Sequence, residues 1–291
     1  MTTAAAEAAG ALQEHRPMLL GLAYRLLGSR HDAEDVLQEA YLRWFGVDRS
    51  TVAEPRRYLS RVVTRLALDR LRVRQAARET YVGTWLPEPV PTAPSPFGPL
   101  DRAELRDSLS TALLHVLERL TPPERAVYVL HTAFDLPYAE IAEILDRSPA
   151  DCRQLHHRAT ARVRQEQRRF TASRAERERL LDAFLAAARD GDLATLTGLV
   201  AADATAWNDG GGRVKAARNP VTGADRIARF FAGIYGPSRP WTMRRVELNG
   251  EPAALMTHGD GSLYTLTVSA ADGRITGVYV VGNPEKLPQV D

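Results

Sequence analysis

The chain has a single cysteine, Cys152, among its 291 residues, so neither an internal disulfide nor a zinc site built on several cysteines can form. Lysine is almost as scarce, since Lys215 and Lys286 are the two lysines and arginine supplies the other basic residues. The 38 basic residues nearly balance 36 acidic ones, for a formal charge of +2. Overall charge therefore does not identify a nucleic-acid binder, and any basic surface must be local.

The Ala-rich residues 1 to 10 are too few to cross a membrane and lack the basic start of a signal peptide. We therefore expect no membrane partner, and the lone cysteine suits a reducing cytoplasm. A composition of 44% hydrophobic and 25% charged residues is ordinary for a globular protein. The length predicts two or three domains.

Residues 122 to 164 carry the clearest local pattern in the chain. Two helix starts are marked by capping boxes, each a Thr or Ser three residues before an acidic residue and directly before a proline. A link of three residues, 146 to 148, joins the second of these helices to a preceding helix over residues 138 to 145. This arrangement predicts a helix-turn-helix, whose second helix enters a DNA groove. The boxes pair Thr121 with Glu124 and Ser148 with Asp151.

The second of these helices has one apolar face, which recurs at helical spacing and is expected to be buried. The opposite face carries arginine, glutamine and histidine, and arginine and glutamine can read base edges through two hydrogen bonds. The alternative is a solvated surface helix, which the coincidence of caps, turn and basic face disfavours. The apolar face consists of Cys152, Leu155, Ala159 and Val163.

An apolar pattern from Leu12 to Gly28 predicts a buried helix, and Ser29 with Asp32 then opens a second helix. The outward face of that second helix is acidic and amide-rich, with one exposed apolar residue, which suits a protein partner better than DNA. A solvated face is the alternative. Its exposed members include Asp35, Gln38, Glu39 and Leu42.

Pro55 starts a further helix, expected from about Arg57 to Arg78. Four arginines at spacings of four, four and seven form a basic edge that could follow a phosphate backbone or simply be solvated. We call Arg57, Arg61, Arg65 and Arg72 the arginine stripe. The predicted core side consists of Leu59, Val62, Val63, Leu66 and Val73.

The order of these elements resembles an RNA polymerase sigma factor of the extracytoplasmic-function (ECF) class. The resemblance rests on DAEDVLQEAYLRWF, on PRRYLSRVVTRLALDRLR and on YAEIAEILDRSPADCRQLHHRATARVR, and it covers roughly residues 12 to 170. One departure is Pro137, which stands where such helices usually have a Ser or Thr cap.

The resemblance implies a site for each element. The acidic helix would bind the clamp helices of the polymerase β′ subunit through Asp35, Gln38, Glu39 and Leu42. The residues 47 to 54 loop and the arginine stripe would hold the melted minus-ten promoter strand. The helix-turn-helix would read the minus-thirty-five element through Arg147, Ser148, Arg153, Gln154, His157 and Arg158.

Six prolines between residues 87 and 99 predict an extended linker. The preceding Tyr81 to Trp85 cluster is too apolar for a plain spacer, and we expect it to pack on a folded domain of this protein. After residue 170 the pattern changes to short helices and then strands, with hairpin turns at Asn249-Gly250, Asp260-Gly261 and Asp272-Gly273. This predicts an α+β domain.

Helices followed by a curled antiparallel sheet resemble the SnoaL-like branch of the NTF2-like cone fold, and the whole chain resembles the SigJ-like subgroup of ECF sigma factors, which carries such a domain. The resemblance implies that this domain regulates in cis, so that no separate anti-sigma factor is required. The three stretches that support it are residues 81 to 89, DGGG and NPEKL. Its regulatory or interdomain residues would be Tyr81, Trp85, Asp209, Gly210, Gly211, Gly212, Asn283 and Pro284.

Cone folds also include enzymes, and an acid or base in a pocket could transfer a proton. We expect no catalysis, because an Asp before three glycines is more often a turn, and we expect the glycines to let another chain segment approach the backbone closely. A small ligand in this domain is left open. The candidate pocket residues are Trp207, Asp209, His258, Tyr264, Tyr279 and Asn283.

The sequence thus predicts a multidomain protein with two all-α sigma domains, the second with the helix-turn-helix, and a C-terminal α+β SnoaL-like cone. The expected function is a sigma factor that binds core RNA polymerase and promoter DNA, with no cofactor and no metal. The alternatives are a ligand-sensing helix-turn-helix regulator and a DNA-tethered isomerase or cyclase. The expected boundaries are 1–80, linker 81–104, 105–170 and 175–291.

Overall fold

The chain folds into two compact units in the computed structural model, and each is described by itself. The helical unit comprises Met1–Glu79, Pro94–Ser108 and Leu117–Arg162, and the sheet unit comprises Thr80–Ala93, Leu109–Val116 and Val163–Asp291. The structure describes all residues except 1–2, 49–50, 78–80, 94–95, 98–107 and 288–291, so the predicted boundaries at 80 and 104–105 lie outside the described residues.

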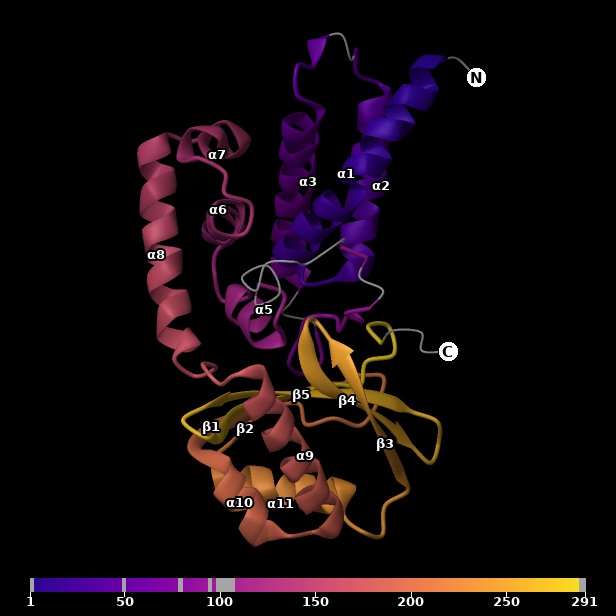
Figure 1. The fold of residues 1–291 in the computed structure, drawn as a ribbon, viewed down its shortest axis with the longest axis vertical. Coiled ribbons are helices and arrows are strands. Elements are labelled where there is room, and N and C mark those ends of the chain that lie inside the picture. Colours follow the sequence, from indigo (N-terminus) through magenta and orange to yellow (C-terminus); the bar gives the residue numbers. More distant parts are fainter. Residues whose placement is uncertain (1–2, 49–50, 78–80, 94–95, 98–107, 288–291) are drawn as a thin grey trace. The chain divides into compact units, whose positions relative to one another are not determined.

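Three long helices open the helical unit (Figure 1): α1 (Thr3–Leu27), α2 (Arg30–Phe45) and α3 (Pro55–Ala77). The predicted cap of α2 is confirmed, because the Ser29 hydroxyl accepts a hydrogen bond from the Asp32 amide at 3.1 Å. On α3 the predicted core position Val73 is wrong, since its side chain is 70% exposed while Leu71 is buried. At this part of the helix the side chains that reach α2 are those of Arg70 and Arg74, which pair with Asp32.

The helix-turn-helix has the predicted elements, with α6 (Pro122–Thr132) before α7 (Tyr138–Leu145) and α8 (Pro149–Gln167). Pro137 caps α7 without a side-chain hydrogen bond, as its lack of a hydroxyl predicts. Arg125 of α6 ties this part of the unit to α1. Its buried guanidinium donates to the Arg25 carbonyl at 3.1 and 3.2 Å and pairs with Glu118.

The sheet unit is a mixed six-stranded sheet in the order β2-β1-β6-β5-β4-β3. Three helices, α9 (Arg174–Asp190), α10 (Leu193–Leu199) and α11 (Ala224–Tyr235), pack against one face of it (Figure 1), and their apolar residues form one core with the strands. A short helix, α5 (Thr111–Leu117), precedes them in the chain. The strands are β1 (Val200–Asp209), β2 (Val221–Thr222), β3 (Trp241–Leu248), β4 (Glu251–His258), β5 (Leu263–Ala271) and β6 (Arg274–Val281).

The predicted meander β3 to β6 is confirmed, with left-handed backbone at Asn249, Gly250, Asp272 and Gly273 in its turns. The sheet is not wholly antiparallel, because β1 pairs with β6 in parallel. The predicted Thr222 cap of α11 is wrong. Thr222 lies in β2 opposite Thr205, and Gly223 takes the cap position. Helical portions followed by an α+β cone confirm the predicted fold class.

Candidate functional site

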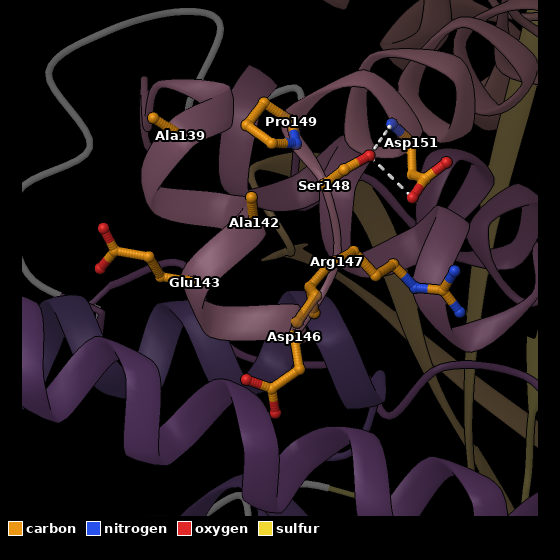
Figure 2. Close-up of a pocket in the computed structure, with 9 residues that line it drawn as sticks. Ala139, Ala142, Glu143, Asp146, Arg147, Ser148, Pro149 and Asp151 are labelled. Carbon is orange, nitrogen blue, oxygen red and sulfur yellow. Dashed lines mark hydrogen bonds between the residues drawn. The ribbon is translucent and has the colours of Figure 1, made fainter.

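The turn between α7 and α8 is a concave surface lined by both helices and by the three-residue link. Figure 2 shows Ser148 closing the capping box: its hydroxyl accepts from the Asp151 amide at 3.1 Å and donates to the Asp151 carboxylate at 2.8 Å. Asp146 ends α7 in a left-handed conformation, with φ 51°. The turn therefore fixes where α8 begins and which of its side chains face outward.

The predicted faces of α8 are confirmed. Cys152, Leu155, Ala159 and Val163 are buried, while Arg153, Gln154 and His157 are exposed. Arg158 is also exposed, but its guanidinium lies 3.3 Å from the Glu124 carboxylate, to which Arg162 pairs at 2.9 Å. Arg147 and Ser148 lie exposed in the turn itself. The N-terminal half of α8 thus presents the Arg153 guanidinium, the Gln154 amide and the His157 imidazole to solvent, together with the Arg158 guanidinium, which is partly held by Glu124.

The arginine stripe on α3 is partly engaged by α7 within the same unit. Arg57 pairs with Glu143 at 3.0 Å and with Glu140 at 3.5 Å. Arg65 pairs with Asp146 at 2.8 Å and donates to the Ile144 carbonyl at 2.9 Å. In Figure 2 the Asp146 carboxylate points away from the turn toward the neighbouring helix.

Neither of the other two stripe arginines forms an ion pair with α7 within the described residues. Arg72 pairs with Asp69 of its own helix at 2.7 Å, and Arg61 is half-buried. Two of the four arginines that the sequence assigned to DNA are therefore occupied by carboxylates of the helix-turn-helix.

The acidic surface of α2 combines charge with exposed apolar groups. Asp35 pairs with Arg70 of α3, Glu39 pairs with Arg43 at 2.7 Å, and Gln38 is exposed. Leu42 is 70% exposed, as predicted, and Phe45 is 49% exposed one turn farther on. The sequence interpretation missed Phe45, although its spacing of three from Leu42 places both on one side of the helix.

Asp209, at the end of β1, anchors the linker in the sheet unit. Its carboxylate is fully buried and accepts hydrogen bonds from the Tyr81 hydroxyl at 2.5 Å and the Leu86 amide at 2.8 Å. Lys286 pairs with the same carboxylate at 2.7 Å. Burial, followed by the hydrogen bond and charge of Asp209, raises the pKa of the Tyr81 phenol, so the hydroxyl stays protonated and donates.

Lys286 and Asn283 complete this contact. The Lys286 ammonium donates to the Leu86 carbonyl at 2.6 Å and lies 3.8 Å from the centre of the Trp85 ring, a cation–π distance. Asn283 donates to the Tyr81 hydroxyl at 3.2 Å, whereas Pro284 is exposed. We call Asp209, Asn283 and Lys286 the linker anchor. These contacts confirm that the Tyr81 to Trp85 cluster packs on a folded domain of the same chain.

The glycines after Asp209 leave room for this approach, as predicted. A Cβ on Gly212 would meet the Val82 side chain at 3.2 Å, and a Cβ on Gly211 would meet Asn283 at 2.3 Å. Both glycines also have positive φ, 72° and 56°. Gly210 is close to its own loop, since its Cβ would lie 2.8 Å from the Val214 carbonyl oxygen.

A second linker contact was not predicted. Asn249 in the β3–β4 turn accepts from the Val90 amide at 2.9 Å through its side chain and donates to the Leu109 carbonyl at 2.9 Å. Its own amide donates to the Val90 carbonyl at 2.8 Å, and Glu251 accepts from the Thr111 amide at 2.9 Å. The Asn-Gly dipeptide indicated the turn but gave no sign that the asparagine side chain also holds the linker.

The predicted pocket residues do not form one site, because Trp207, Tyr279 and Asn283 are not among the residues that line the cavity of the other three. Asp209, His258 and Tyr264 line a cavity of about 600 Å³. Trp207 and Tyr279 stack on each other, with ring centres 5.0 Å apart, and Trp207 lies 4.8 Å from the His115 ring. Asn208 and Val280 line the cavity in their place. The prediction of a single six-residue pocket is therefore wrong.

Over the part of the chain that the structure describes, no group of three or more His, Cys, Asp or Glu side chains could hold a metal ion. Within the same residues, no helix is long and apolar enough to cross a membrane.

Comparison with protein families and known proteins agrees with this geometry. Residues 11–77 match the family described as Sigma-70 region 2, and residues 110–163 match Sigma-70, region 4. The first match spans α1 to α3, and the second spans the helix-turn-helix.

Relatives extend the similarity to nearly the whole chain. The ECF RNA polymerase sigma factor SigJ of Mycobacterium tuberculosis is 36% identical over 288 residues, which cover 95% of this chain and 91% of the relative. The probable ECF RNA polymerase sigma factor SigI of that species is 32% identical over 281 residues, with coverages of 95% and 93%. The crystal structure of SigJ superposes with a TM-score of 0.72 and 35% identity over 95% of each chain.

Proposed function

The chain belongs to the extracytoplasmic-function family of RNA polymerase sigma factors, and from this membership we propose which of its surfaces bind polymerase, bind DNA and regulate. The single observation that carries the proposal is the presence in one chain of a partly apolar α2 surface, an arginine stripe and an exposed recognition helix. We assign the α2 surface and the arginine stripe to a domain of residues 1–80. The recognition helix belongs to a domain of residues 105–170. The linker is 81–104 and the regulatory domain is 175–291.

The α2 surface is the polymerase contact. Leu42 and Phe45 supply apolar area that is exposed in the free protein, and Asp35, Gln38 and Glu39 surround it with polar groups. An apolar centre with a polar rim is the usual anatomy of a protein interface. Its partner would be the clamp helices of the β′ subunit of core RNA polymerase.

The two DNA contacts are separate elements. Arg153, Gln154 and His157 on α8, with Arg147 and Ser148 in the turn, read the minus-thirty-five element in the major groove. Arg158 adds a phosphate contact beside its pair with Glu124. The arginine stripe on α3 holds the backbone of the melted minus-ten strand.

The arginine stripe offers fewer charges to DNA while Arg57 and Arg65 are paired with α7. A phosphate would have to replace the carboxylates of Glu143 and Asp146. The described arrangement of the helical unit is therefore a closed one, and α3 and α7 separate when the protein loads on promoter DNA.

The C-terminal domain regulates in cis by holding the linker. Asp209 accepts a hydrogen bond from the Leu86 amide, and Lys286 donates one to the Leu86 carbonyl. Asn249 binds both the amide and the carbonyl of Val90 in the same way. Because the linker sets the spacing of the two DNA-reading parts, a domain that fixes the linker can control promoter engagement. We propose that it takes the place of a separate anti-sigma factor, in the cytoplasm where the polymerase works.

We propose further that the protein is not an enzyme. Asp209, the strongest candidate base, already accepts from a phenol, an amide and an ammonium, which leaves it no role in proton transfer. A DNA-tethered isomerase would need such a group free. A ligand-sensing repressor would leave the α2 surface and the arginine stripe without a role.

Run-off transcription with core RNA polymerase and a library of promoter fragments tests this function. The protein added to core enzyme, with no other sigma factor present, is expected to give transcripts with defined start sites. A Leu42→Asp variant should retain its fold and lose these transcripts. A protein that starts at no promoter unless another sigma factor is added would contradict the proposal.

A further inference from the structure

The cavity of about 600 Å³ in the sheet unit has the size of a small-molecule site. It is enclosed by the ends of β1 and β6, by α11, by β3 to β5 and by the loop of residues 213–216. None of the roles assigned to the linker anchor or the DNA-binding elements uses this space.

One wall of the cavity is aromatic. Trp241 lies at its centre, with ring-centre distances of 4.9 Å to Tyr235, 5.3 Å to Tyr264 and 4.8 Å to His258. The Trp241 indole nitrogen donates to the Ile234 carbonyl at 2.9 Å, which fixes the ring in place. Such a wall favours a flat ring system, which can stack on it or meet it edge to face.

The cavity has an unpaired hydrogen-bond donor, so a suitable ligand carries a hydrogen-bond acceptor. Asn208 lines it and is 5% exposed, and among the described residues its side-chain nitrogen has no hydrogen-bond partner. A buried donor without a partner destabilises the fold, because it has lost its hydrogen bonds to water. A ligand oxygen placed beside Asn208 would remove this destabilisation.

The charges of the cavity favour an anion. Its two carboxylates are already satisfied: Asp209 by the linker anchor, and Asp260 by the Ser262 amide at 2.9 Å and His258 at 3.0 Å. Hydrogen bonds from Ser262 and His258 lower the pKa of Asp260 to about 2. The exposed side chains of Lys215 and Arg239 also line the cavity, and the structure shows no ion pair to either of them within the described chain.

We propose that this cavity binds a small aromatic molecule carrying one negative charge, such as an aryl carboxylate. Its rings pack against Trp241 and Tyr264, and its charge lies toward Lys215 and Arg239. Asp209 and Gly282 line the same cavity, and Asp209 also holds Tyr81 and Leu86. Asp209 therefore connects the cavity directly to the linker, so a bound molecule can alter how the linker is held. We assign the molecule the role of an effector rather than of a substrate.

Anilinonaphthalene sulfonate, an aromatic anion whose fluorescence rises on binding, is a suitable probe for the full chain. Gly233 lines the cavity on α11, and a Cβ there meets no atom within 4 Å, so Gly233→Trp can add bulk beside the cavity from an open position. Gly198 on α10 is equally open but does not line the cavity, so Gly198→Trp is the matched control. Gly233→Trp should weaken probe binding roughly tenfold and Gly198→Trp should not. Equal binding by both variants would overturn the proposal.

The charge preference needs its own comparison. The double variant Lys215→Gln/Arg239→Gln changes exposed side chains and should fold normally, as thermal unfolding would verify. It should weaken the sulfonate probe by roughly fivefold and leave phenylnaphthylamine, the uncharged analogue, within about twofold of the unsubstituted protein. If both probes respond alike, the site does not select an anion and the proposed ligand class is wrong.

Discussion

Glu124 connects two helices of the helix-turn-helix domain, α6 and α8. Its carboxylate accepts from the Thr121 amide at 3.1 Å and hydroxyl at 2.9 Å, and it also pairs with Arg158 and Arg162 of α8. A capping residue that also binds the recognition helix couples the start of α6 to the position of α8. Arg158 is therefore partly structural, which leaves Arg153 as the stronger candidate for reading a base.

Arg153→Ala should cost about 1–3 kcal/mol in binding to sequences selected from a random duplex pool, if Arg153 makes two hydrogen bonds to one base. Discrimination at a single base pair should be lost with it. Arg164→Ala, also on the exposed surface of α8, should weaken all sequences alike and lower the salt dependence. Equal loss on every sequence with Arg153→Ala would make it a phosphate contact.

Glu124 also predicts a pH dependence of stability. Burial raises the pKa of this carboxyl, but hydrogen bonds from Thr121 and the Arg162 and Arg158 interactions outweigh it, so the net shift is downward. A carboxyl whose pKa is lower in the folded than in the unfolded protein stabilises the fold at pH values above the unfolded pKa. This stabilisation is lost as the pH falls through the folded pKa. Between about pH 5 and pH 3, the free energy of unfolding should therefore fall more in the native protein than in Glu124→Gln.

Denaturant unfolding at several pH values measures this difference. At neutral pH, Glu124→Gln should be less stable by about 1 kcal/mol, the usual worth of a cap. Parallel acid curves for the two proteins would contradict the assigned role of the carboxylate.

At the level of helices and strands, local signals proved the most predictable. Capping spacings located the starts of α2, α6 and α8, and Asn-Gly and Asp-Gly located the turns of the meander. These signals depend on neighbours within a few residues. The predictions for Val73 and Thr222 were wrong because they depended on residues far away in the sequence. Asp32 pairs with Arg74, the neighbour of Val73, and Thr205 lies opposite Thr222 in the sheet.

Contacts between elements could not be predicted in the same way. The arginine stripe was visible as a periodic pattern, but its pairing with α7 depends on how two helices pack and leaves no periodic trace. Likewise, the choice between Trp207 and Asn208 as a cavity residue depends on the phase of β1, which the sequence alone did not settle.

The pairing of α3 with α7 predicts that removing one carboxylate frees the arginine stripe. Asp146→Asn should strengthen binding of single-stranded DNA by up to about fivefold, since an exposed pair is worth about 0.2–1 kcal/mol. Asp225→Asn removes the same charge from an exposed pair on α11 and is the control for net charge. Fluorescence anisotropy at several salt concentrations measures both, and equal affinities would contradict the closed arrangement.

The linker anchor predicts slow hydrogen exchange at the Leu86 amide, which donates its hydrogen bond to the buried Asp209 carboxylate. Asp209→Asn should speed exchange at this amide by at least about tenfold, because a buried charged acceptor is lost. Asp203→Asn changes an exposed aspartate of the same strand and should have no effect there. Tyr81→Phe, which removes the hydrogen bond to Asp209 and the one from Asn283 but leaves the Leu86 contact, should have an intermediate effect.

Across the whole molecule, the order of parts was predictable because each part has its own pattern: helical periodicity, a proline-rich stretch, and then alternating strands. The family followed from three motifs in a fixed order, and the similarity to SigJ over 95% of the chain supports it. The grouping of the first part of the linker, residues 81–93, with the C-terminal sheet could not be predicted from such patterns. It rests on contacts such as Leu86 to Lys286, between residues 200 positions apart.

The central claim is that the C-terminal domain controls a sigma factor through its hold on the linker. Single-round transcription from one promoter, with core polymerase and equal amounts of each protein, tests it most directly. Asp209→Asn and Tyr81→Phe should both change transcript yield in the same direction, the first by at least about threefold, while Asp203→Asn leaves it unchanged. Equal yields from all four proteins, each verified as folded, would contradict the account.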